Sequence, residues 1–105
     1  MSEAAKKKTY GTHYLKEHPK FFSDLIEGRR LYEIRCDDRC YQVGDVVIVA
    51  EYDPSRVVGR SSEGYTGRQV SGTIVFLTRT QDLRAAGIEA LQTGFVVFQV
   101  EWLDA

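Results

Sequence analysis

The sequence has few of the residues from which metal sites and disulfide frameworks are built. It contains two cysteines, Cys36 and Cys40, and two histidines, His13 and His18. A tetrahedral zinc site would have to recruit both histidines across the fold, and a small disulfide would require an oxidising compartment. We therefore expect two reduced thiols, no bound metal and no other cofactor.

Long apolar runs and familiar catalytic motifs are also missing. No window approaches the roughly 18 apolar residues of a membrane span, and the start MSEAAKKKTYGTHY lacks an apolar secretion signal. We expect a cytoplasmic protein without membrane contact. No nucleophile elbow, GxxxxGK or HExxH motif occurs, so the sequence nominates no catalytic residue and does not require an enzyme.

The charge is only weakly graded along the chain. Residues 1–40 contain nine Lys and Arg and seven Asp and Glu, and residues 41–80 contain four of each. Residues 81–105 contain one Lys or Arg and four Asp and Glu, so that the net charge of the chain is −1. This gradient excludes a generic, strongly basic polyanion binder, so any contact with nucleic acid must be local.

The length and the periodicity predict one small domain with a helix near its start. A chain of 105 residues with 43% apolar content can bury a single core. We predict a solvated tail over residues 1–10 and one domain over 11–105. Pro19 suits a first helical position and Gly28 fits just past the end, so HPKFFSDLIEG predicts an amphipathic helix near residues 19–27. Its apolar stripe is Phe21, Phe22, Leu25 and Ile26.

The rest of the chain is typical of strands. Alternation or short β-branched runs predict strands at HYLK, LYEIR, VVIVAEY, RQVSGTIVFLTR and FVVFQVEWL. Residues 51–67 predict a long loop or a hairpin excursion, and Gly72 predicts a bulge or a bend in its strand. Residues 80–94 predict either a broken helix or a loop. The result is an α+β, mainly β fold, a curved β-barrel of five to six strands with one helix. Its predicted buried residues are Phe22, Ile26, Ile34, Val47, Val49, Ile74, Phe76, Val96, Phe98 and Val100.

The strand GRRLYEIR concentrates charge on one face. Alternation places Glu33 and Arg35 side by side on the face opposite Ile34. One interpretation is an exposed ion pair worth about 0–1 kcal/mol. In the other, Arg35 offers its planar donors to a phosphate or base edge, while Glu33 orients it or accepts from an exocyclic amine.

Other candidate ligand contacts come from two further segments. Lys16 in HYLK is a candidate cleft residue, and Tyr65 and Arg68 in the glycine-flanked GYTGR suit a mobile rim, although loop solubility explains that segment nearly as well. A lone histidine such as His13 is more often structural. The aspartates of CDDRC and VGD suit turns, in which they satisfy backbone donors.

The order of several motifs resembles a known family. HYLK, HPKFFSDLIEGRRLYEIR, DDRCYQVGDVVIVAEYD, GYTGR and GFVVFQVEW, from about His13 to Trp102, are similar to small bacterial and phage proteins of the ASCH branch of the PUA-like superfamily. GRRLYEIR resembles the hallmark GxKxxExR of that branch. The resemblance implies a PUA-like β-barrel, a fold with RNA-binding members, and a cleft between barrel and helix that the hallmark lines.

One hallmark position departs from the pattern. Gly28, Glu33 and Arg35 match the glycine, acid and arginine, whereas Arg30 stands at the lysine. Some ASCH-type proteins resemble amidohydrolases that deacylate the exocyclic nitrogen of cytidine with a lysine, a threonine and a glutamate. Arg30 stays protonated and cannot act as a base, and Glu33 stands where the threonine should be. Only Lys16, from another strand, is left to supply a lysine to that cleft.

We therefore predict a module that binds RNA or a nucleotide in this charged cleft, with a protein partner also possible and the oligomeric state open. One alternative is an amidohydrolase of N4-acylated cytidine. Another is a phage or mobile-element regulator that binds a host protein complex through the exposed loop at 53–67. The predicted ligand-binding residues are Lys16, Arg30, Glu33, Arg35, Tyr65 and Arg68, with no metal ligand.

Overall fold

One curled sheet and two helices make up the structure, a computed structural model that describes residues 10–103. Residues 1–9 of the predicted tail lie outside this range. In chain order the elements are β1 (Thr12–Glu17), α1 (Pro19–Ile26), β2 (Tyr32–Cys36), β3 (Val46–Tyr52), β4 (Tyr65–Arg79), α2 (Thr80–Ala85) and β5 (Phe95–Trp102). Two short 3-10 helices, η2 (Pro54–Arg56) and η3 (Ser61–Gly64), lie between β3 and β4.

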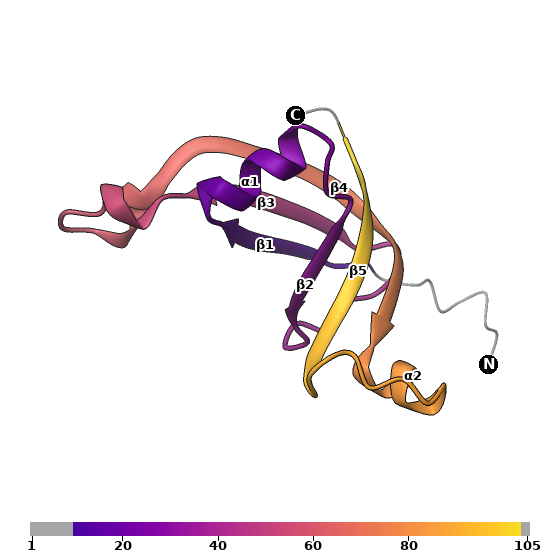
Figure 1. Cartoon of the computed structure of the whole chain (residues 1–105). Helices are drawn as coiled ribbons and strands as arrows, with labels where there is room; N and C mark the ends of the chain where they lie inside the picture. The colour runs from indigo at the N-terminus through magenta and orange to yellow at the C-terminus, as the bar shows by residue number, and fades with distance from the viewer. Residues whose placement is uncertain (1–9, 104–105) are drawn as a thin grey trace, which may run out of the picture.

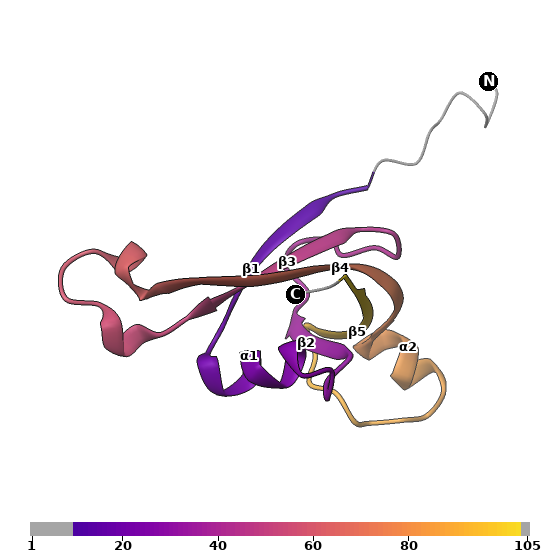
Figure 2. The same cartoon turned by 90° about the horizontal axis from the view of Figure 1, so that it is seen from above.

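The strand order in the sheet is β1-β3-β4-β5-β2. The β1–β3 pair is parallel and the other pairs are antiparallel. The sheet curls, so that the edge strand β2 comes round towards the side on which α1 lies (Figures 1 and 2). This arrangement confirms the predicted mainly β fold with a curved five-stranded sheet and one principal helix.

Local sequence signals set the ends of α1. Pro19 occupies the first turn, the Lys20 N–H donates to Nδ1 of His18, and Gly28 follows the helix with φ +74°. Phe22 and Leu25 are buried between the helix and the sheet. The predicted helix is thus confirmed to within one residue at its end.

The core lies on the inner face of the curl, beneath α1. Most of the predicted buried residues are confirmed. The core also takes in Leu25, from the predicted apolar stripe of the helix, and Leu15, Tyr41 and Val70, which the sequence did not indicate. The buried apolar residues are Leu15, Phe22, Leu25, Tyr41, Val47, Val49, Val70, Ile74, Val96, Phe98 and Val100.

Three predicted core residues are wrong. Phe76 is 62% exposed because a bulge between Ile74 and Phe76 shifts the alternation of β4 and turns that ring outward. Ile34 is 51% exposed because its neighbour Glu33 takes the inward position on β2. Ile26, in the last turn of α1, also lies at the surface.

The bulge predicted at Gly72 lies further along β4, between Ile74 and Phe76, and Gly72 is needed for a different reason. A Cβ at position 72 would come within 2.5 Å of Val100 Cγ1 and 2.6 Å of the Glu101 carbonyl oxygen. Glycine is therefore required for the close approach of β5 to β4. The ambiguous segment 80–94 begins with the short helix α2 and continues as a loop, and 53–64 forms the predicted hairpin excursion.

A buried carboxylate joins the starts of β1 and β3. Asp45 accepts hydrogen bonds from His13 Nε2 at 2.8 Å and from the N–H groups of Gly11 at 2.9 Å and Gln42 at 3.0 Å. The His13 ring packs against Tyr41. Burial alone would raise the pKa of Asp45, but the hydrogen bonds from His13, Gly11 and Gln42 together lower it. Asp45 thus satisfies backbone donors at a turn, as predicted, and His13 has the structural contacts expected of a lone histidine.

The Asp45→Asn variant should lower the free energy of unfolding by about 1–3 kcal/mol near neutral pH, because a buried hydrogen-bonded charge is lost. Since folding lowers the pKa of Asp45, its contribution is present above the unfolded pKa, about 3.9, and is lost as the pH falls through the folded value. Urea unfolding at neutral and acidic pH should show that the free energies of unfolding of the wild type and of Asp45→Asn converge as the pH falls. Asp38→Asn, at an exposed position, is the control; equal effects of both variants would contradict the assignment.

Candidate functional site

Arginine side chains span the gap between the two edges of the sheet. Arg35 of β2 donates from Nη2 to the Lys16 carbonyl oxygen at 3.2 Å, and Arg39 donates from Nη1 to the Tyr14 carbonyl oxygen at 2.7 Å. Both acceptors belong to β1, whose free edge would otherwise present unpaired carbonyl groups. The curl is therefore closed by guanidinium groups between β1 and β2.

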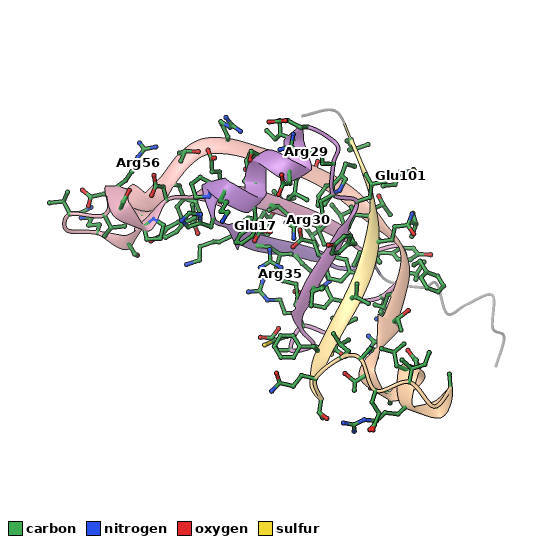
Figure 3. All side chains as sticks on the ribbon, in the orientation of Figure 1. Glu17, Arg29, Arg30, Arg35, Arg56 and Glu101 are labelled. Carbon is green, nitrogen blue, oxygen red and sulfur yellow. The ribbon has the colours of Figure 1, made fainter. Side chains whose placement is uncertain are left out.

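Two arginines and two glutamates form a charged cluster at this gap, which we define as Glu17, Arg30, Glu33 and Arg35. Figure 3 labels three of them, Glu17, Arg30 and Arg35. Arg35 Nε donates to Glu33 Oε1 at 2.8 Å, and Arg35 Nη2 lies 3.3 Å from Glu17 Oε2. Arg30 pairs with Glu17 and lies 3.1 Å from Glu33 Oε2. Glu33 and Arg35 thus lie side by side, as predicted, but Glu33 is only 1% exposed.

The electrostatics of the charged cluster are internally balanced. Burial raises the pKa of Glu33, the positive charge of Arg35 opposes that shift, and Glu17 reinforces it. Two guanidinium groups face two carboxylates, so the charged cluster offers little net field to an incoming phosphate. Nε and Nη2 of Arg35 donate to groups within the protein, which favours the structural interpretation of this residue.

The ion-pair row continues along the inner face of the sheet. Glu51 lies beside Glu17 in the β1–β3 register and accepts a 2.6 Å hydrogen bond from the Thr66 hydroxyl. Arg68 Nε lies 3.5 Å from Glu51, and its guanidinium group lies 5.2 Å from the centre of the Phe22 ring. Arg68 is therefore held between β3 and α1.

A separate hollow of about 310 Å³, the outer pocket, involves strands β1, β3 and β4. Tyr14 and Tyr65 line it with rings that are 69% and 46% exposed. Lys16 also lines it, and its Nζ lies 4.5 Å from the centre of the Tyr52 ring, which meets Tyr65 edge-on. The lining residues are Tyr14, Leu15, Lys16, Ile48, Ala50, Tyr65, Gly67, Arg68 and Gln69.

The structure divides the predicted site residues between two groups. Arg30, Glu33 and Arg35 belong to the charged cluster on the inner face, whereas the Lys16 and Tyr65 side chains belong to the outer pocket. Lys16 alternates with the buried Leu15, so its ammonium group points away from Glu33, and only its backbone carbonyl contacts the charged cluster. Arg68 lines the outer pocket and also pairs with Glu51.

Sequence reasoning left two polar side chains of the outer pocket, Tyr14 and Gln69, out of the predicted site. Tyr14 shares a strand face with Lys16, which was a readable signal, but Gln69 meets them only through the pairing of β4 with β3. Within residues 10–103 no three His, Cys, Asp or Glu side chains gather as metal ligands. Cys36 and Cys40 are exposed and unpaired with each other. In this part of the chain no helix has the length and hydropathy to span a membrane.

Comparison with known proteins places the chain in a family. Residues 12–100 match the family described as "Domain of unknown function (DUF3850)". The chain belongs to this family. It is also similar to the "Uncharacterized 12.9 kDa protein in GpA 3'region" of Escherichia phage P2, with 36% identity over 70 residues, 67% of this chain. The matched part spans 57% of the phage protein, so the relationship is to part of that protein.

The Arg35→Ala variant should lower the free energy of unfolding by about 1.5–3 kcal/mol, because it leaves the buried Glu33 with one guanidinium partner fewer and frees the Lys16 carbonyl. Chemical denaturation measures the loss. Arg29→Ala, which removes an arginine from exposed ion pairs with Asp24 and Glu27, should change stability little. If the two variants were equally stable, the charged cluster would not hold the fold together.

Proposed function

We propose that this DUF3850 protein binds a nucleotide or single-stranded nucleic acid at the outer pocket. One observation carries the proposal: two exposed tyrosine rings and an ammonium group line the same hollow, and no carboxylate lines it. Its volume, about 310 Å³, falls within the range of small-ligand sites. The ASCH-like motif order, which we propose reflects PUA-like ancestry, supports RNA as the nucleic acid.

The side chains of the outer pocket offer each contact that a nucleotide needs. Exposed tyrosine rings stack on bases irrespective of sequence. The Lys16 ammonium group makes no ion pair among the described residues and is available to a phosphate. The Gln69 amide can donate to and accept from a base edge. These features support a ligand that combines an aromatic base with a phosphate.

Arg35 of the charged cluster and Arg39 support the backbone of the outer pocket. Arg35 and Arg39 hold the carbonyl groups of Lys16 and Tyr14, the two β1 residues whose side chains line the pocket. We infer that the arginines position the binding residues, and that contact with the ligand belongs to the outer pocket.

The Tyr14→Ala variant should weaken binding of a single-stranded RNA by about 1–3 kcal/mol, the value of one base stacked on an aromatic ring. Isothermal titration calorimetry at low salt measures this loss. Tyr32→Ala is the matched control, since Tyr32 is similarly exposed on β2 but lies outside the outer pocket. Equal losses for both variants, or no binding by the wild type to RNA or to nucleotides, would contradict the proposal.

The amidohydrolase alternative needs a lysine and an acid that act together. Because Lys16 and Glu33 project from opposite faces of the sheet, we expect no release of cytidine from N4-acetylcytidine by the wild type or by Arg30→Lys. Chromatography of the reaction against a buffer control tests this. Saturable turnover that Lys16→Ala abolishes would make the enzyme the leading function.

A regulator that binds a protein complex is the second candidate function. The outer face of β2, β4 and β5 carries a hollow of about 340 Å³ lined by apolar side chains, among them Leu31, Tyr32 and Phe76, and no charged residue lines it. Exposed apolar surface of this kind suits a protein contact, and the similarity to a phage protein agrees with a phage-related role. Binding of nucleotides at the outer pocket would favour the first proposal over this one.

A further inference from the structure

The hairpin between β3 and β4 carries two arginines that the fold does not use. Arg56 and Arg60 are exposed, and neither forms an ion pair with any described residue. Arg84 forms none either but donates to the Thr93 hydroxyl, whereas the other arginines form ion pairs: Arg29, Arg30, Arg35, Arg39, Arg68 and Arg79. The hairpin projects from the body at the end opposite α2 in both ribbon views (Figures 1 and 2), and Figure 3 shows Arg56 on it. Positive charge without an internal partner is therefore placed on a projecting arm.

The acidic residues of the hairpin accept hydrogen bonds from other groups of the hairpin itself. Glu63 Oε1 accepts hydrogen bonds from the N–H groups of Val58, Gly59 and Arg60 at 2.7–3.0 Å, and these bonds lower the pKa of Glu63. Asp53 likewise accepts from the N–H and hydroxyl groups of Ser55. The carboxylates thus shape the hairpin, and both guanidinium groups remain available at its surface.

Tyr52 connects the hairpin to the outer pocket. Its hydroxyl donates to the Ser61 carbonyl oxygen at 2.7 Å, and Gly64 packs so closely against its ring that a Cβ there would lie 2.5 Å from Cζ. The same ring contacts Tyr65 and lies under the Lys16 ammonium group. The arm is therefore anchored by a residue that also contacts two side chains of the outer pocket.

We propose that the ligand is a single strand of several nucleotides, with a base at the outer pocket and neighbouring phosphates at Arg56 and Arg60. This inference rests on the proposed function and deepens it. A guanidinium group presents paired donors that match the oxygens of a phosphate. The overall charge of −1 gives no general attraction to nucleic acid, so arginines without ion-pair partners on the arm that Tyr52 anchors are the local contact that such a ligand requires.

The test compares uridine 5′-monophosphate with an oligouridylate of about ten nucleotides. The Arg56→Ala/Arg60→Ala protein should show a slope of log affinity against log salt about 1.4 smaller for the oligonucleotide, since each single-strand phosphate contact contributes about 0.7. Between about 50 and 200 mM salt, the wild type should then lose roughly sevenfold more affinity than the double variant. Affinity for the mononucleotide should not change.

Arg84→Ala is the matched control, because Arg84 is an exposed arginine on α2, at the opposite end of the molecule. Equal slopes for the wild type and the double variant would overturn the inference while leaving the outer pocket intact as a nucleotide site. A decrease in slope of about 0.7 for Arg84→Ala, the same change per arginine, would overturn it too, since charge alone would explain the effect. If the wild type bound neither probe, the proposed function would fall together with the inference.

Discussion

The closure of the sheet by Arg35 is the contact on which the rest of the structure depends. A five-stranded open sheet has two edges, and here β1 and β2 face each other across a gap without strand pairing. Arg35 reaches from β2 to the Lys16 carbonyl and to Glu17 on β1, and it also pairs with Glu33 on its own strand. A guanidinium group suits this position because its planar fork carries five donors, enough to serve several acceptors at once.

Closing the sheet in this way requires that the buried charges of the cluster be paired. Burying Glu33 at the inner face is unfavourable unless the carboxylate is paired and hydrogen-bonded, and the removal of one partner costs more than the pair contributes. Arg35 donates a hydrogen bond to Glu33 Oε1, Arg30 forms an ion pair with Glu33 Oε2 that is not a hydrogen bond, and Glu17 balances the second positive charge. The fold therefore retains these arginines for internal reasons, and the binding that we propose lies at the outer pocket, on strands β1, β3 and β4.

The sequence predicts the local elements well and their pairing poorly. Pro19 and Gly28 mark α1 because helix ends depend on a few adjacent residues. The parallel pairing of β1 with β3 depends on contacts between residues distant in sequence, so periodicity alone does not contain it. For the same reason the sequence pattern does not predict that Glu33 is buried. Its burial depends on an arginine from the preceding turn, an arginine from its own strand and an acid from β1.

The predicted site shows the same division between local and distant information. Alternation in HYLK separates Lys16 from Leu15, but only the pairing with β3 decides which of them faces the core. The contacts of Arg30 explain why an arginine stands where the GxKxxExR hallmark has a lysine. Its guanidinium group bridges Glu17 and Glu33 and lies 5.8 Å from the Tyr32 ring centre. A compact ammonium group would lack that planar fork, so an arginine at position 30, just before β2, fits a cluster whose charges close the sheet.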